Sequence, residues 1–303
     1  MKCTNIGTCF SSSTAMTTRL RSVLLCTPVN PRHIPKSLAA GADLVVIDLE
    51  DSVENDRKAE ARATVASALA GGDSCYVRVN AITSSNFEQD LAALGAAPGL
   101  GGVMVPKVEH GDELLAVDAR LTRLEKEHGR PPGSIAVIPL IETALGVENL
   151  MAILRSAPRV PRISFGAGDY TLDIGARLTA DEIALAYIRA RVVNASRACG
   201  LAAPIDSVWV DVGDDAGLQA SATRAQTMGF AGKLCLHPKQ VATVNAAFSP
   251  TPLDIEKAQR YVREFEAATA AGLAAIHIDG VLVDYPIAER ARRTLVQAGL
   301  SPA

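Results

Sequence analysis

Two carboxylates in the middle of the chain each follow a short apolar run. Glu142 comes directly after the run 135–141, which reads IAVIPLI, and Asp169 lies in the segment FGAGDY. Because parallel α/β folds place their chemistry at the carboxyl ends of strands, we expect both side chains at one end of a sheet. A buried carboxylate is costly unless it is paired or binds a cation. The pair suits Mg²⁺, which prefers oxygen ligands and keeps several of its waters.

Each of these acids also has a purely structural interpretation. Glu142 could interact with the dipole of a helix that begins near Thr143, and Asp169 could cap a helix or a turn. Gly166 and Gly168 fit either interpretation, since glycine allows a tight turn as well as close approach of the backbone to a ligand. We favour the metal site because the two acids follow consecutive predicted strands, which would bring them close together.

A second acidic group ends an earlier apolar run. The segment DLEDSV covers residues 48–53, and its acids cannot all bind one metal because their side chains point in different directions. We expect Glu50 and Asp51 to surround the metal site, where they hold metal-bound water and contribute to substrate binding. The alternative is that Asp51 caps the next helix and that one acid is solvated.

Two arginines could bind an anionic substrate. Arg78 lies in YVRVN at the end of the third apolar run, and its guanidinium suits a carboxylate or an enolate oxygen. The alternative for Arg78 is a salt bridge to an acid of DLEDSV, and both can hold at once. Arg21 faces the same choice, but a salt bridge is favoured there because Arg21 comes at the start of a strand.

Two other residues follow apolar runs. Lys107 comes after Pro106 at the end of the fourth run and could be a Schiff-base amine. We prefer to interpret Lys107 as a surface lysine or one that faces a phosphate. His237 in CLHPKQ could be a general base, although a hydrogen-bonded structural histidine is the more common case.

The elements that would position these residues follow a regular rhythm. Short apolar runs alternate with Ala-rich amphipathic segments, and the runs are continuous rather than alternating, which is typical of parallel strands buried on both faces. Eight such strand–helix units predict an α/β fold, a (β/α)₈ TIM barrel. The predicted strands are residues 22–27, 44–49, 75–79, 102–106, 135–141, 162–165, 207–212 and 234–236.

The last part of the chain departs from this rhythm. Residues 252–271 read as a helix, Asp279-Gly280 between two apolar runs is a strong hairpin signal, and Pro286 fits the first turn of a final helix. We therefore expect a barrel over residues 19–250. A helix–hairpin–helix extension over 251–303 would pack on the barrel or on a neighbouring subunit. Residues 1–18 are rich in Ser and Thr and are expected to form a disordered tail.

Composition narrows the classes of function. The net charge is −3, aromatic residues make up 4% of the 303 residues, and no apolar run approaches the roughly 20 residues of a membrane span. We therefore expect neither a nucleic-acid nor a membrane partner. The six cysteines form no CxxC pair, and Cys26, Cys75 and Cys235 lie in apolar runs. This pattern is typical of reduced core residues in a cytoplasmic protein.

Eight motifs occur in an order that carries a family resemblance: RSVLLCTP, GADLVVIDLEDSV, YVRVN, GVMVPK, PLIET, SFGAGDY, APIDSVW and GFAGKLCLHPKQ. Over residues 19–290 the chain resembles the citrate lyase beta-subunit-like family, within the 4-hydroxy-2-oxoheptanedioate aldolase/citrate lyase superfamily. The resemblance implies a Mg²⁺-dependent carbon–carbon lyase with a TIM-barrel fold. Its substrate would be a 3-hydroxyacyl-CoA thioester of the citryl-, malyl- or citramalyl-CoA type, cleaved to acetyl-CoA and an oxo acid.

The resemblance also implies roles for particular residues. Glu142 and Asp169 would be the metal ligands, and Arg78 would contact the carboxylate and carbonyl region of the substrate. Asp284 would reach into the site of a neighbouring subunit as the general acid, so we expect a homo-oligomer, a trimer or a hexamer. One departure is Pro28-Val29, where the family usually has Pro-Gly.

Other functions are compatible with the same metal site. The chain could be an acyl-CoA thioesterase or a malate-synthase-like condensing enzyme. It could also be an aldolase that acts on free hydroxy-oxo acids without CoA. A third alternative is a non-autonomous citrate lyase subunit that works only with an acyl-carrier partner.

Overall fold

Eight parallel strands form a closed barrel in the computed structural model, which describes residues 19–301. The strands pair in chain order, and β8 closes the barrel against β1. The prediction of a (β/α)₈ barrel is therefore confirmed. The strands are β1 (Ser22–Cys26), β2 (Leu44–Asp48), β3 (Cys75–Arg78), β4 (Leu100–Val105), β5 (Ala136–Ile141), β6 (Ser164–Phe165), β7 (Ile205–Asp206) and β8 (Gly232–Cys235).

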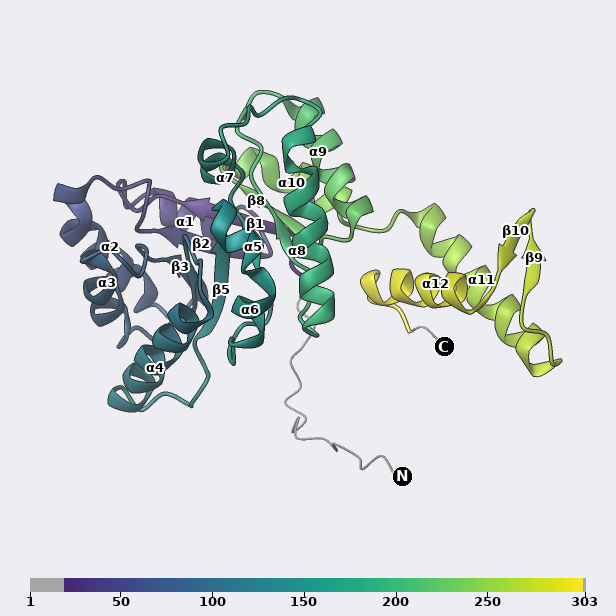
Figure 1. Cartoon of the computed structure of the whole chain (residues 1–303), viewed down its shortest axis with the longest axis horizontal. Coiled ribbons are helices and arrows are strands. Elements are labelled where there is room, and N and C mark those ends of the chain that lie inside the picture. The colour runs from purple at the N-terminus through teal and green to yellow at the C-terminus, as the bar shows by residue number, and fades with distance from the viewer. Residues whose placement is uncertain (1–18, 302–303) are drawn as a thin grey trace.

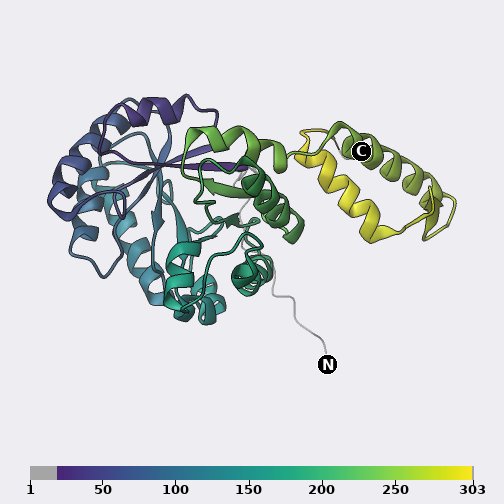
Figure 2. The same ribbon diagram turned by 90° about the horizontal axis from the view of Figure 1, so that it is seen from above.

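Helices surround the barrel, as seen from above in Figure 2. Local sequence signals explain several helix ends. The side chain of Asp214 caps α9, Gly229 ends that helix with a φ of 104°, and Pro238 occupies the first turn of α10. The helices are α1 (His33–Leu38), α2 (Lys58–Leu69), α3 (Asn86–Leu94), α4 (Gly111–Glu127), α5 (Ala144–Glu148), α6 (Leu150–Arg155), α7 (Ala167–Asp173), α8 (Ala186–Ala198), α9 (Asp215–Met228) and α10 (Pro238–Ala247).

Apolar side chains form two layers around the strands. The inner cluster fills the barrel, and its buried members are Val23, Val46, Met104, Ile138, Leu140, Ile205 and Leu234. The larger outer cluster lies between the strands and the helices and includes Leu24, Ile47 and Val77. Successive strand residues thus enter opposite clusters, which explains why the strands are continuously apolar in sequence.

The predicted seventh strand was wrong. The strand is Ile205–Asp206, whereas the apolar run 207–212 has left the sheet and exposes 62% of Val210. Asp206 is fully buried because it accepts hydrogen bonds from Arg189 and Lys233. Because a buried, paired carboxylate interrupts the apolar pattern of this strand, the pattern does not predict the strand. The exposed run beside it is apolar in sequence and was therefore predicted as a strand.

The C-terminal segment forms a helix–hairpin–helix unit, as predicted. It consists of α11 (Pro252–Ala270), β9 (Ile276–Ile278), β10 (Val281–Val283) and α12 (Tyr285–Gln297). Asp279 and Gly280 both have positive φ angles, 50° and 78°, as a type I′ hairpin turn requires. The unit has its own buried cluster, which includes Tyr261, Phe265 and Val283. Figure 1 shows it to one side of the barrel, joined through the link after α10.

Some predictions concern other parts of the chain. The expected disordered tail, residues 1–18, lies outside the described residues. Cys26, Cys75 and Cys235 are buried with free thiols, as expected of core cysteines. No helix within residues 19–301 combines the length and the apolar character that a bilayer-spanning segment needs.

Candidate active site

The predicted acidic residues meet at the carboxyl end of the barrel. Glu142 directly follows β5, and Asp169 lies in the first turn of α7, which follows β6. β5 and β6 pair directly, and this pairing brings the two acids to adjacent positions. Glu50 and Asp51 follow β2 on the other side of the mouth. Two cations, Arg78 and Lys107, connect these acids.

Arg78 is held by an acid of the neighbouring strand. Its Nε and Nη2 donate to the two carboxylate oxygens of Asp48 at 2.7 Å each. Its Nη1 lies 3.2 Å from Glu50 Oε2 and 3.4 Å from Asp51 Oδ2. The salt bridge that the sequence offered as an alternative is thus present, and it fixes the plane of the guanidinium. The same pairing lowers the pKa of Asp48, although burial of that carboxyl acts in the opposite direction.

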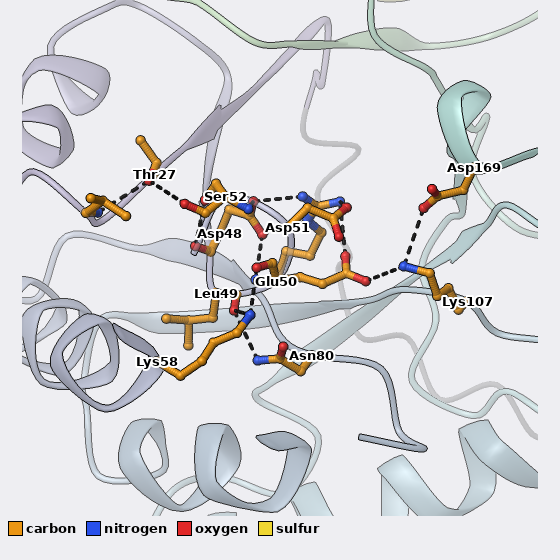
Figure 3. A network of polar contacts seen from close by, with 12 residues as sticks. Thr27, Asp48, Leu49, Glu50, Asp51, Ser52, Lys58, Asn80, Lys107 and Asp169 are labelled. Atoms are coloured by element: carbon orange, nitrogen blue, oxygen red, sulfur yellow. Dashed lines mark hydrogen bonds and ion pairs between the residues drawn. The ribbon is translucent and has the colours of Figure 1, made fainter. Parts of the chain in front are cut away.

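The backbone of the turn after β2 is also held in place (Figure 3). The buried Lys58 ammonium donates to the carbonyl oxygens of Leu49 and Glu50 at 2.7 Å each. The side-chain amide of Asn80 donates to the Leu49 carbonyl at 3.0 Å. These bonds hold the backbone of residues 49–53, here called the acidic turn, in one position. The fold therefore sets where the Glu50 carboxylate lies.

Lys107 belongs to the acidic site, although its side chain is 39% exposed, so its interpretation as a surface or phosphate-facing lysine lacked these acidic partners. Its Nζ donates to Glu50 Oε1 at 2.7 Å and lies 3.4 Å from Asp169 Oδ2. Its backbone N–H donates to Glu142 Oε1 at 2.9 Å. Figure 3 shows Lys107 between Glu50 and Asp169. The nearby carboxylates raise the pKa of Lys107 above its usual value although burial opposes this, so the amine is charged and unsuited to Schiff-base formation.

Glu142 is almost completely buried and lies close to other acids. Burial, followed by repulsion from Glu50 and Asp169, raises its pKa to about 8. Its carboxylate rests against Gly166, where a Cβ atom would lie 2.2 Å from Glu142 Oε2. Glycine at this position is therefore required for the carboxylate to occupy its place.

The arrangement of these side chains fits a small divalent cation. Five carboxylates gather here, and among the described residues the cations that form ion pairs with them are Arg78 and Lys107, while the nearby Lys58 ammonium binds backbone carbonyls. The carboxylates are those of Asp48, Glu50, Asp51, Glu142 and Asp169. The buried Glu50 Oε2 has no hydrogen-bond partner, although it lies within ion-pair distance of Arg78. Among residues 19–301 no three His, Cys, Asp or Glu side chains cluster closely enough to hold a metal by themselves. Two protein carboxylates completed by water and substrate oxygens match the ligation habits of Mg²⁺.

Comparison with known proteins places the chain in a family. A sequence model described as HpcH/HpaI aldolase/citrate lyase matches residues 21–238. The chain belongs to the HpcH/HpaI aldolase/citrate lyase family. The family named by the sequence motifs is thereby confirmed.

Relatives within this family match nearly the whole chain. Citrate lyase subunit beta of Leuconostoc mesenteroides subsp. cremoris is 33% identical and covers 91% of this chain and 93% of its own length. The L-malyl-CoA/beta-methylmalyl-CoA lyase of Cereibacter sphaeroides is also 33% identical, and the match covers 90% of this chain and 92% of that protein. The chain is also similar to a solved structure of CitE from Mycobacterium tuberculosis, which is in complex with magnesium, acetoacetate and coenzyme A. The two are 30% identical with a TM-score of 0.76, and the match covers 92% of this chain and 98% of CitE. The prediction of a carbon–carbon lyase is confirmed by this membership.

The structure does not bring every predicted residue of this family member to the site. Arg21 precedes β1 at the amino end of the barrel, where its guanidinium and its backbone N–H both donate to Asp43. The salt bridge favoured for Arg21 from the sequence is therefore present, and its other possible role, in substrate binding, is corrected. Asp284 caps α12 in the extension by accepting from the Ile287 N–H at 3.2 Å.

His237 caps α10, where its Nδ1 accepts from the Lys239 N–H, which is the structural role favoured for it.

Sequence reasoning missed two members of the site. Asp48 was not distinguished from the other acids of the segment DLEDSV, and its pairing with Arg78 depends on the register between β2 and β3. Lys107 was noted at a strand end, and this position was the signal that could have placed it among the acids. Its side-chain partners lie after β2 and on α7, which are far apart in sequence.

Proposed function

We propose that the protein is a Mg²⁺-dependent lyase that cleaves a 3-hydroxyacyl-CoA thioester to acetyl-CoA and an oxo acid. The substrate would be of the citryl-, malyl- or citramalyl-CoA type. The observation that carries the proposal is the acid-rich mouth of the barrel, where Glu142 and Asp169 follow paired strands and Glu142 lies within electrostatic range of the fixed Arg78. The named activities of the citrate lyase and malyl-CoA lyase relatives support it.

The charges of the site suggest how its residues take part. Glu142 and Asp169 would hold Mg²⁺, which when bound supplies a Lewis acid for the oxygens of the oxo-acid half of the substrate. Arg78 would offset the negative charge that develops on the thioester carbonyl as the carbon–carbon bond breaks. Asp48 keeps the guanidinium oriented for this task. The substrate hydroxyl loses its proton, and the carbon of the departing thioester enolate receives one.

Asp284 is the proposed donor of that last proton, from a neighbouring subunit. Within one chain it belongs to the extension, to one side of the barrel (Figure 1). The neighbouring Leu282 and Tyr285 expose 51% and 66% of their surface, and Leu172 and Ile183 beside the barrel mouth expose 79% and 70%. Exposed apolar side chains at both places favour contact between copies of the chain. We therefore propose a homo-oligomer, a trimer or a hexamer. We also propose a cytoplasmic location, which the free thiols of Cys26, Cys75 and Cys235 support.

A cavity next to the acidic turn could receive the CoA part of the substrate. It has a volume of about 300 Å³ and is bounded by the ends of β1 and β8 and by α1. His33 and Lys36 contribute nitrogen donors suited to phosphate, and Thr27 joins the cavity to the acidic turn through a hydrogen bond to the Ser52 carbonyl at 3.4 Å. Val29 replaces the usual glycine here, and its N–H donates to Thr27 Oγ1 at 3.3 Å.

The test is a panel of citryl-, malyl- and citramalyl-CoA thioesters incubated with the protein and Mg²⁺, followed by mass analysis of the products. We expect acetyl-CoA and the matching oxo acid from at least one thioester, with loss of turnover when EDTA removes the metal. Release of free CoA would instead indicate a thioesterase or a condensing enzyme. Cleavage of free hydroxy-oxo acids alone would indicate an aldolase that does not use CoA.

A non-autonomous subunit is the second candidate function. It is favoured by the citrate lyase subunit beta relative, whose identity to this chain, 33%, equals that of the malyl-CoA lyase. An assay of the isolated chain distinguishes the two candidate functions. The substrates compared are CoA thioesters and the same acyl groups attached to an acyl-carrier protein. Turnover only on the carrier-bound acyl group would favour the subunit.

A further inference from the structure

Lys107 is unusual in both its backbone and its contacts. It is one of three non-glycine residues with a positive φ, 53°, among the described residues. A left-handed conformation is unfavourable for a long side chain and tends to persist at functional sites. It directs the backbone N–H to Glu142 and the ammonium to Glu50 and Asp169. A single residue thus contacts acids that follow three different strands.

An ordinary exposed ion pair does not account for this arrangement. Surface salt bridges contribute little to folding stability and do not require a particular backbone conformation. Here the Glu50 side chain is only 8% exposed, whereas the side chains of Lys107 and Asp169 are 39% and 37% exposed, so the Lys107 ammonium links a buried acid to one that solvent and ions can reach. In the described part of the chain, Lys107 is the only cation within 4 Å of Asp169. The ammonium therefore supplies positive charge where a metal held by Glu142 and Asp169 would also supply it.

We infer that Lys107 is an internal cation that holds Asp169 and Glu50 together when the metal is absent and that sets the affinity of the site for Mg²⁺. A metal held by Asp169 would displace the ammonium from its longer contact, 3.4 Å, and the ammonium would keep its shorter contact to Glu50, 2.7 Å in this structure. The backbone bond from Lys107 to Glu142 does not depend on the side chain, so Glu142 keeps its position throughout. Lys107 is in this sense a positioning residue, and the inference rests on the Mg²⁺ site of the proposed function.

The experiment is isothermal titration calorimetry with Mg²⁺ alone, on substrate-free protein. Because Lys107→Met removes a competing positive charge a few ångströms from the ion, we expect Mg²⁺ to bind about tenfold more tightly. Lys107→Arg keeps the charge and should bind Mg²⁺ about as the unchanged protein does. Lys239→Met is the matched control, because Lys239 is an exposed lysine in the first turn of α10 that forms no ion pair in the described structure.

The outcomes separate this inference from the proposed function. If the unchanged protein binds no Mg²⁺, both fail. If it binds Mg²⁺ and Lys107→Met binds it equally or more weakly, only the role of Lys107 is overturned. Thermal melting checks that each variant is folded. Lys107→Gln, which keeps a polar group beside Glu50, gives the same test if the methionine variant does not fold.

Discussion

The guanidinium of Arg78 donates to both carboxylate oxygens of Asp48, and each donor–acceptor distance is 2.7 Å. The parallel register of β2 and β3 places these two residues side by side at the strand ends. Such a two-point contact fixes the guanidinium plane and leaves Nη1 directed at Glu50 and Asp51. The electrostatic group of the proposed reaction is therefore oriented before any substrate binds.

Replacing Arg78 tests its place in the reaction. We expect Arg78→Ala to lower kcat by about 10²–10³-fold, the scale of losing one preoriented electrostatic group. Arg78→Lys keeps the charge but lacks the two parallel N–H groups that bind Asp48. Compared with Arg78→Ala, it should therefore restore folding stability more fully than kcat. Steady-state kinetics and thermal melts of both variants provide the measurement. An unchanged kcat in Arg78→Ala would remove Arg78 from the mechanism.

Two glycines near the metal site offer a matched pair of substitutions. A Cβ at Gly166 would lie 2.2 Å from Glu142 Oε2, whereas a Cβ at Gly168 meets nothing within 4 Å. Gly166→Ala must displace the Glu142 carboxylate, so we expect Mg²⁺ affinity to fall by about 10–100-fold. Gly168→Ala should leave it unchanged, as measured by calorimetry. Equal affinities in the two variants would argue against Glu142 as a ligand.

The raised pKa of Glu142 predicts a pH-dependent cost in the metal-free protein. Between its ordinary value of 4.5 and the raised value of about 8, the folded protein holds a proton that the unfolded chain has lost. The contribution of Glu142 to the free energy of unfolding is therefore complete at low pH and is lost as the pH rises through this window. Glu142→Gln removes this loss, so it should melt at a higher temperature than the unchanged protein above pH 8 in EDTA.

Added Mg²⁺ should reverse that order. It stabilises the unchanged protein by binding the folded state, and it should leave the melting temperature of Glu142→Gln nearly unchanged. Thermal melts across the pH window, with EDTA and with Mg²⁺, measure both effects. Glu256→Gln, in the exposed N-terminal part of α11, controls for loss of a carboxylate elsewhere. If Glu142→Gln is less stable than the unchanged protein at every pH, the assigned pKa shift is contradicted.

The proposed role of Asp284 in a neighbouring subunit predicts complementation. Asp284→Asn and Arg78→Ala should each be nearly inactive alone. Oligomers refolded from an equal mixture would regain about a quarter of the unchanged activity, because a site is intact only when its barrel comes from Asp284→Asn and its extension from Arg78→Ala, which is about one of the four possible pairings. Activity of the mixture is compared with that of each variant refolded separately. No recovery, in oligomers shown to be mixed, would indicate that Asp284 does not act between subunits.

Much of the fold could be predicted from local patterns. Continuous apolar runs identified seven strands, and the Asp279-Gly280 pair identified the C-terminal hairpin. The seventh strand was missed because the buried Asp206 interrupts its apolar pattern. The burial of that acid is possible only through Arg189 and Lys233, which are distant in sequence.

Residue order alone shows that acids and a guanidinium follow successive predicted strands, and these groups are expected to gather because the carboxyl ends of parallel strands share one edge of the barrel. The tertiary structure decided which of these groups touch. Arg21 forms an ion pair with Asp43 at the opposite end, and the partly exposed Lys107 pairs with acids that follow two other strands. The physical reason is that ion pairs depend on register, on side-chain reach and on the backbone angle of a single residue, and residue spacing along the chain encodes none of these.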